Sequence, residues 1–225
     1  MGIQLPRWVW VGAGSLAFVA GIGNVVGYLD FEHQAITHLT GTTSLLGAAV
    51  AHGELRSIGG LLGVIVAFVA GAMGSGLIIQ DSTLRLGRRY GVVLAIEAVL
   101  LVAAVPLLKR QMLAGAWLAA AACGLQNAMA STYSGSLVRT SHVTGLFTDL
   151  GIAIGHAMRG MPLQRRRVAL CLLVIVCFLV GGIAGAWLYG LFGYRALYFP
   201  AALTGSVGLA YAGHVQRKLW SSPNR

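Results

Sequence analysis

Charge is scarce in this sequence, and acidic side chains are the scarcest. Only 6 of the 225 residues are Asp or Glu, and charged residues make up 10% of the chain. Average soluble domains carry about 25% charged residues, so this composition excludes an ordinary soluble domain. The net charge of +10 comes from Lys and Arg in the predicted loops, as topology and anionic headgroups require of a membrane protein. We therefore expect no nucleic-acid partner.

Cysteine is also rare, and the common catalytic motifs are missing. The three cysteines lie in apolar stretches and form no Cys-x-x-Cys pair, so the sequence predicts no disulfide framework. It has no His-Glu-x-x-His spacing, no evident Ser/His/Asp order and no phosphate-binding glycine loop. We predict that the chain is not an enzyme and needs no cofactor. A metal-dependent intramembrane enzyme is the third and weakest functional hypothesis.

What the sequence has instead is long stretches without Asp, Glu, Lys or Arg. Each exceeds the ~20 residues that a helix needs to cross the hydrocarbon core of a bilayer. These stretches are 8–29, 57–80, 111–138, 168–194 and 196–216, and a sixth, 90–108, contains only Glu97. The sequence predicts an all-α polytopic membrane protein whose first partner is the lipid bilayer.

One pattern occurs twice, 104 residues apart. Segments 38–52 and 142–156 share seven of fifteen residues, and each begins with His-x-Thr-Gly. A Gly-x-x-Asn motif precedes each segment, ending at Asn24 and at Asn127. A Gly-x-x-Gly pair follows each, at an offset of 111 residues, beginning at Gly71 and at Gly182. We predict one domain over 1–225 with a two-fold internal repeat, its halves being 8–108 and 111–216.

The number of spans depends on the motif segments 33–53 and 140–158, which are rich in Thr, Ser, Gly and His. If both cross the membrane, the protein has eight spans and parallel halves. If both are broken, it has six spans and inverted halves. Interruptions at matching positions of two halves are typical of transporter sites. We therefore favour six spanning helices plus two broken or re-entrant motif segments, with eight spans as the alternative.

The motif segments also contain the candidate binding residues. A Thr-Gly break inside the membrane leaves backbone N–H or C=O groups that need a partner in the protein, water or a ligand. We predict a substrate or ion site at the bilayer midplane, between 37–47 and 141–151. Its candidate residues are His38, Thr40, Gly41, Asn127, His142, Thr144, Gly145 and Thr148. In the competing interpretation these side chains only hydrogen-bond neighbouring helices.

Asp149 and Glu97 are acids within apolar stretches. A charge at the bilayer centre costs about 2.5–3.5 kcal/mol on insertion scales, so each acid needs a partner or a proton. For Asp149 we expect His142 or Arg139 as the partner. Glu97 is expected to face the bundle interior, either as a proton carrier or as a hydrogen-bond acceptor. Both are candidate proton-coupling residues.

The motif strings resemble the YoaK-like family of small bacterial membrane proteins, a family of unknown function. The resemblance rests on Thr37-His38-Leu-Thr40-Gly41 and on Arg139-Thr-Ser-His142-Val-Thr144-Gly145, with Thr148-Asp149-Leu-Gly151 after it. It implies a six- or seven-helix protein of the bacterial cytoplasmic (inner) membrane and no established substrate. The first half departs from the family pattern at Thr42, where we expect an asparagine.

Together these features predict a secondary transporter or exporter of an unidentified small solute or ion, driven by protons. Both chain termini are expected on the cytoplasmic side. The alternative is a membrane accessory or scaffold protein that does not transport. An oligomer of identical chains is compatible with either function.

Overall fold

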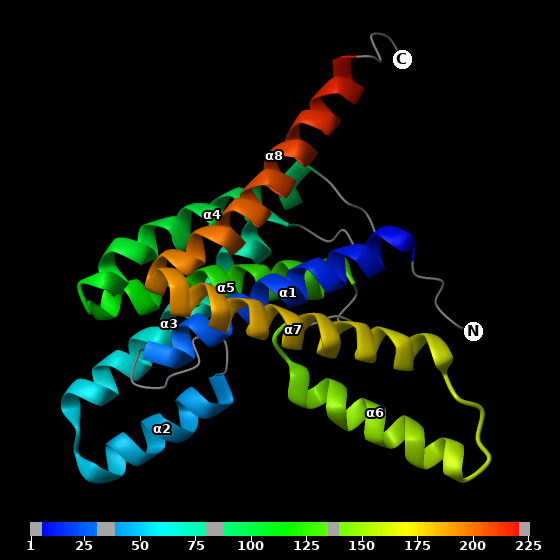
Figure 1. Ribbon diagram of the computed structural model, residues 1–225, viewed down its shortest axis with the longest axis horizontal. Helices are drawn as coiled ribbons and strands as arrows, with labels where there is room; N and C mark the ends of the chain where they lie inside the picture. Colours follow the sequence, from blue (N-terminus) through cyan, green and yellow to red (C-terminus); the bar gives the residue numbers. More distant parts are fainter. Residues whose placement is uncertain (1–5, 31–38, 80–87, 135–139, 221–225) are drawn as a thin grey trace.

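The described part of the chain is helical. The structure, a computed structural model, describes residues 6–30, 39–79, 88–134 and 140–220, and these ranges contain no β-strand. In chain order the helices are α1 Arg7–Asp30, α2 Leu39–His52, α3 Leu55–Ile78, α4 Arg88–Lys109, α5 Leu113–Tyr133, α6 Val143–Met158, α7 Arg165–Phe192, the 3-10 helix η1 Gly193–Leu197 and α8 Tyr198–Trp220 (Figure 1).

Helix length separates two kinds of element. Four stretches of the described chain are long and apolar enough to cross a membrane: α1, α3, α4, and the stretch 165–210 that joins α7 to α8. By contrast, α2 has 14 residues and α6 has 16. At 1.5 Å per residue they are about 21 and 24 Å long, shorter than a ~30 Å hydrocarbon core. The two motif segments are therefore short helices, as the Thr-Gly interruptions predict.

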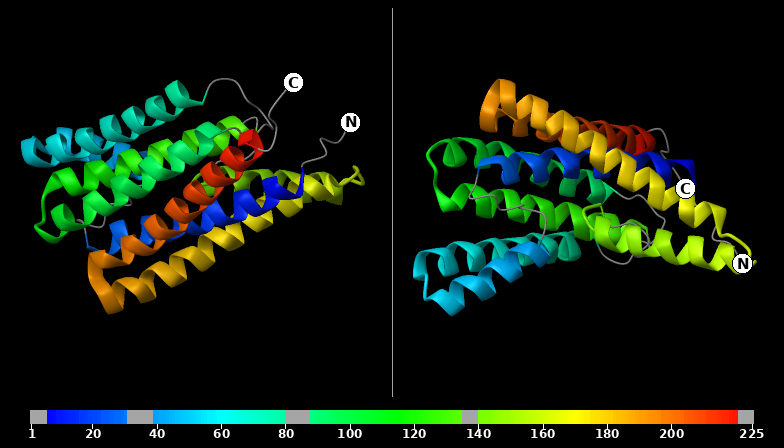
Figure 2. Two further views of the ribbon diagram at one scale, coloured as in Figure 1. Left: turned by 90° about the horizontal axis from the view of Figure 1, so that it is seen from above. Right: turned by 60° about the horizontal axis from the view of Figure 1, so that its bottom comes forward.

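The long helices form a bundle, and the two short helices lie along one side of it (Figures 1 and 2). Within the bundle α1 packs against α7, α3 against α5, and α4 against both α5 and α8. Outside it, α2 packs against α3 and α6 against α7. Helices at matching positions of the two predicted halves run in opposite directions: α1 and α5, α2 and α6, α4 and α8 (Figure 1).

Glycine lets two pairs of long helices touch backbone to backbone. A Cβ atom at Gly21 of α1 would overlap the carbonyl oxygen of Phe178 on α7, and one at Gly181 would overlap that of Phe18. The α3–α5 pair has the same arrangement, with Gly124 against the Phe68 carbonyl and Gly71 against that of Ala121. Small residues allow this close packing where lipid offers no hydrophobic drive for helix association.

These contacts relate the two helix pairs at fixed offsets. Phe18 and Gly21 lie 103 residues before Ala121 and Gly124, while Phe68 and Gly71 lie 110 residues before Phe178 and Gly181. In the packing, the counterpart of Gly71 is therefore Gly181. The sequence match at offset 111 is one residue out of register with these contacts, because Gly182, and not Gly181, has a glycine three residues later.

The main core lies where α1, α3, α4 and α5 meet η1. It includes Ile22 of α1, Val105 and Leu108 of α4, and Tyr194 and Leu197 of η1, all buried. The outer faces of the long helices remain apolar. Exposed side chains there include Val66, Met73, Leu77, Trp187 and Leu191. Apolar surface of this extent is what a lipid-facing bundle presents.

Candidate functional site

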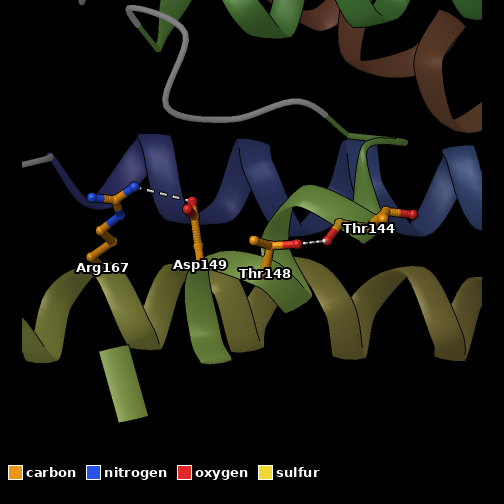
Figure 3. A network of polar contacts seen from close by, with 4 residues as sticks. All are labelled: Thr144, Thr148, Asp149 and Arg167. Atoms are coloured by element: carbon orange, nitrogen blue, oxygen red, sulfur yellow. Dashed lines mark hydrogen bonds and ion pairs between the residues drawn. The ribbon is translucent and has the colours of Figure 1, made fainter. Parts of the chain in front are cut away.

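The second motif marks the start of α6. His142 is the N-cap residue, and its side chain makes no capping hydrogen bond. The imidazole lies against Gly145, where a Cβ atom would overlap the ring. Thr148 donates a hydrogen bond to the Thr144 carbonyl oxygen over 3.1 Å (Figure 3). The absence of a side chain at Gly145 thus leaves space for the His142 ring. The Thr148 hydroxyl is hydrogen-bonded to the backbone of its own helix.

The first motif marks the start of α2. His38 lies outside the described residues, and Thr40 and Gly41 fall in the first turn. Here Thr43 donates to the Leu39 carbonyl oxygen over 2.8 Å, and Ser44 donates to that of Thr40 over 3.0 Å. Both short helices therefore satisfy early hydroxyl groups with the carbonyl four residues back.

Hydrogen bonds of the Asn127 side chain connect the second motif to the bundle. Its Nδ2 donates to the Ser141 hydroxyl, and its Oδ1 accepts hydrogen bonds from the Thr140 hydroxyl at 2.9 Å and the Ser141 N–H at 3.3 Å. The asparagine of α5 thus holds the chain immediately before His142. Asn127 positions the motif with its amide group, and its part in substrate binding stays a prediction.

Asp149 forms an ion pair with Arg167. Its Oδ2 lies 3.1 Å from Nη2 of Arg167, in the first turn of α7 (Figure 3). The expected partners were His142 and Arg139, and this assignment is corrected: the described partner is Arg167, while Arg139 lies outside the described residues. The reason is that α6 folds back along α7. Leu146, one turn before Asp149, packs on Leu170 and Val174 deeper in α7.

The two motif helices approach the middle of the molecule but do not meet. Their N-terminal ends, at Thr40 and Thr144, both face inward, and the helices run outward in opposite directions (Figure 1). Over the described residues, α2 and α6 make no contact with each other, because α2 is held by α3 and α6 by α7. The predicted site between 37–47 and 141–151 stays a prediction.

Glu97 is the buried acid of the described chain. Its side chain is 2% exposed, and its Oε2 has no hydrogen-bond partner among the described residues. The same is true of Nε2 of Gln126 on α5, which is also buried. The predicted inward orientation of Glu97 is thus observed. Sequence reasoning did not single out Gln126, although an amide inside an apolar stretch is the same kind of signal as Asn127.

A cavity of about 870 Å³ opens between α1, α7 and α8. Side chains of α4 and α5 close its inner end. Its aromatic lining residues are Trp8, Trp10, Phe18 and Tyr90, and its polar ones include Ser15 and Thr204. The volume lies within the range of small-molecule sites. No motif pointed to this cavity, because its lining comes from five helices whose packing the sequence does not give.

No metal centre is formed by the described residues, which contain no group of three or more His, Cys, Asp or Glu side chains with suitable positions. The three cysteines are free thiols. The hypothesis of a metal enzyme needs His38, His142 and an acid at one point, and His38 lies outside the described residues.

Long apolar helices, an apolar outer face and few buried polar side chains are the features of a helical membrane protein. The chain belongs to the family described as Protein of unknown function (DUF1275), whose model matches residues 13–210. The resemblance to the YoaK-like family is confirmed by this membership. No curated protein and no solved structure matches the chain.

Proposed function

We propose that this protein is a proton-coupled secondary transporter or exporter of a small solute. In this proposal it lies in the bacterial cytoplasmic membrane with both termini cytoplasmic, and it has no enzymatic activity. Its halves, 8–108 and 111–216, form an inverted repeat with six spanning helices and two re-entrant ones. The opposite directions of matching helices and the similar glycine contacts support the repeat.

The observation that carries the proposal is the placement of α2 and α6. Each is too short to span, each begins at a His-x-Thr-Gly motif, and their N-terminal ends face inward from opposite directions. A helix N-terminus offers unpaired N–H groups and partial positive charge. Transporters with inverted repeats bind solutes at such ends near the midplane. The solute site would then be shared by Thr40, Gly41, His142, Thr144 and Gly145.

Unequal packing of matching helices also supports transport. Helix α4 packs closely along α5, but the matching pair, α8 and α1, touches only locally and leaves the cavity. Gly115 of α5 lies against the Leu108 backbone, whereas Gly12, 103 residues earlier, lines the cavity. In alternating access, the two halves exchange such open and closed arrangements.

Of the two acids, Glu97 is the better proton carrier. It is buried and its Oε2 lacks a partner among the described residues, whereas Asp149 is partly exposed and held by Arg167. A buried carboxyl group that can neutralise itself by protonation is the usual carrier in membrane relays. Asp149 remains the second candidate. If Asp149 carries the proton, Asp149→Asn is expected to abolish transport while the protein still folds in the membrane.

The alternative is a scaffold or accessory protein. The hydrogen bonds of Asn127 and Thr148 favour it, since both side chains are used inside the protein. A scaffold needs no water path to the motifs. Access of water to Thr40 and Thr144 therefore separates the two functions.

Thiol accessibility in membrane vesicles tests the proposal. In a chain with Cys123, Cys171 and Cys177 replaced by Ala, single cysteines are placed at Thr40, Thr144 and Asp149. A membrane-impermeant thiol reagent is added from each side, with and without a proton gradient. The control is a cysteine at Val66 of α3, which is 64% exposed on an apolar face. We expect labelling of the three motif cysteines, with a side preference that the gradient shifts, and none of the control. Absence of labelling at all three from both sides would establish the scaffold alternative.

A further inference from the structure

We propose that the cavity between α1, α7 and α8 is a binding site for lipophilic cations, with Glu97 behind its inner end as the counter-charge. This site lies apart from the solute site between α2 and α6, and it shares Glu97 and the cavity with the proposed proton-coupled cycle. The proposal combines three features: a lateral opening, an aromatic wall, and a polar layer at the inner end with unused hydrogen-bonding capacity.

Thr204 lines the inner end of the cavity, and helix geometry places two further polar side chains beside it, behind the lining. Helix α4 runs antiparallel to α5 and α8, so residues three or four apart along each helix form successive layers (Figure 1). The cavity layer contains Leu94, Met129 and Val207. One step further along each helix, this spacing gives a layer of Glu97, Gln126 and Thr204, of which Thr204 lines the cavity. The layer after it is the closed apolar cluster of Leu101, Ala122 and Ala201.

The polar layer has unused hydrogen-bonding capacity. Among the described residues, neither Oε2 of Glu97 nor Nε2 of Gln126 has a partner. The Thr204 hydroxyl donates to the Pro200 carbonyl oxygen over 3.0 Å, which leaves its own oxygen able to accept. Native interiors rarely leave buried polar groups unsatisfied, because each costs about 1–3 kcal/mol. A ligand head at the inner end of the cavity would meet Thr204, with Glu97 and Gln126 directly behind it.

The acidic side chain behind the inner end of the cavity, Glu97, indicates that the ligand is positively charged. Of the acids whose burial is described, Glu54 and Asp149 are not buried and Glu97 is. The basic residues nearest in sequence to the cavity lining, Arg7 and Arg89, are exposed at helix ends. A cation that reaches Glu97 would neutralise a carboxylate that is otherwise costly to bury. Aromatic faces of Trp8, Trp10 and Phe18 add cation–π attraction along the wall.

The route of entry explains why the ligand should be lipophilic. Val11 of α1 and Leu203 and Val207 of α8 line the cavity and are also exposed on the apolar surface. The cavity therefore opens sideways, between two helices that face the hydrocarbon. A ligand that dissolves in the bilayer can enter this opening without crossing water. An apolar body would rest on the aromatic wall while the charge lies near Glu97.

Two ions of equal shape and opposite charge test the site. Tetraphenylphosphonium and tetraphenylborate are titrated into the full-length protein in phosphatidylcholine nanodiscs, with empty nanodiscs as the reference. We expect saturable tetraphenylphosphonium binding that weakens at least tenfold in Glu97→Gln. Tetraphenylborate is expected to bind equally to wild type and variant. The matched control is Glu54→Gln, which removes an exposed acid at the start of α3 and should bind like wild type.

A second variant keeps the test decisive if Glu97→Gln does not fold. Leu203→Trp places a bulky side chain at the exposed mouth and leaves the buried layer intact, and it should weaken tetraphenylphosphonium binding as well. Equal cation binding by wild type, Glu97→Gln and Leu203→Trp would overturn the proposal. Preference for tetraphenylborate would also overturn it, and would point to Arg7 and Arg89 as an anion site. Either result leaves the thiol-accessibility test of the motif helices unaffected.

Discussion

Asp149 of α6 and Arg167 of α7 form an ion pair with 3.1 Å between Oδ2 and Nη2 (Figure 3). The pair joins the second motif helix to the first turn of a long apolar helix. Because Arg167 belongs to the basic cluster with which α7 begins, Asp149 lies beside the charged end of this long apolar helix. His142 lies two turns further along α6, toward the middle of the molecule. The acid and the motif histidine are thus separated along α6 and lie in different surroundings.

A double-mutant cycle measures what this ion pair contributes. The side chains of Arg167 and Asp149 are 57% and 36% exposed, so solvent or headgroups screen the pair. We expect Asp149→Asn and Arg167→Gln each to lower stability slightly, with a coupling energy of about 0.2–1 kcal/mol. Thermal unfolding in detergent, at low and high salt, gives the four values of the cycle. A coupling of several kcal/mol would show that another element covers the pair.

Close helix contacts predict that alanine substitution lowers stability strongly at one glycine of α1 and little at a neighbouring one. Gly21→Ala would push a Cβ atom into the Phe178 carbonyl, while Gly23→Ala meets no atom within 4 Å. We expect overpacking to lower the free energy of unfolding of the first variant by about 1–3 kcal/mol. The second should be neutral or slightly stabilised, since alanine favours helix by up to ~1 kcal/mol over glycine. Apparent melting temperatures in one detergent compare the two.

The other helix pair supplies an independent check. Gly71→Ala should destabilise through the Ala121 carbonyl, while Gly76→Ala on the same helix should not, because nothing lies within 4 Å of its Cβ position. Equal effects of the tight and the open glycines would contradict the packing of α3 on α5. The comparison keeps the residue type, the helix and the substitution constant.

Much of the helical layout could be predicted from the sequence. The predicted stretches 8–29 and 90–108 became α1 and α4 within two residues at each end. The motif stretch 140–158 became α6, beginning three residues later at Val143. Length and the absence of charge suffice for such predictions, because a helix in lipid must satisfy its own backbone. The number of spans stays a prediction.

Contacts between distant side chains could not be predicted in the same way. Arg167 pairs with Asp149 because α6 folds back on α7, and that fold depends on the apolar contact of Leu146 with Leu170. Likewise, Gly205 of α8 lies against Ala98, the residue after Glu97, because α8 returns antiparallel to α4. A single sequence gives the rarity of an intramembrane acid but not the helix that will face it.

Asn127 should control where α6 begins. Its amide binds Thr140 and Ser141 through three hydrogen bonds, so Asn127→Ala leaves several partly buried groups unpaired. We expect the free energy of unfolding to fall by about 1–3 kcal/mol. We also expect a cysteine placed at Thr144 to be labelled faster. The control is Thr132→Ala on the same helix, since among the described residues Thr132 bonds the carbonyl of Ala128, one turn back. Unchanged labelling in Asn127→Ala would mean that α6 is positioned by α7 alone.

Gly12 and Gly115 offer a test of whether the two halves exchange their packing. Gly115 lies against the Leu108 backbone on the closed side, and Gly12 lines the cavity on the open side. Gly115→Ala should therefore lower the melting temperature, because its Cβ atom would lie 2.7 Å from the Leu108 nitrogen. Gly12→Leu should leave the melting temperature unchanged, because the cavity has room for the side chain.

The same Gly12→Leu variant should nevertheless block the closing of α1 on α8. If the halves alternate, that closing needs at Gly12 the backbone contact that Gly115 makes now. We expect a cysteine at Thr144 to lose its gradient-dependent change of side preference in the Gly12→Leu background, while total labelling persists. Gly23→Leu, on the same helix but with nothing within 4 Å of its Cβ position, should keep the change. If both variants keep it, the cavity stays open throughout the cycle, and the asymmetry between α4–α5 and α1–α8 is a fixed property of the fold.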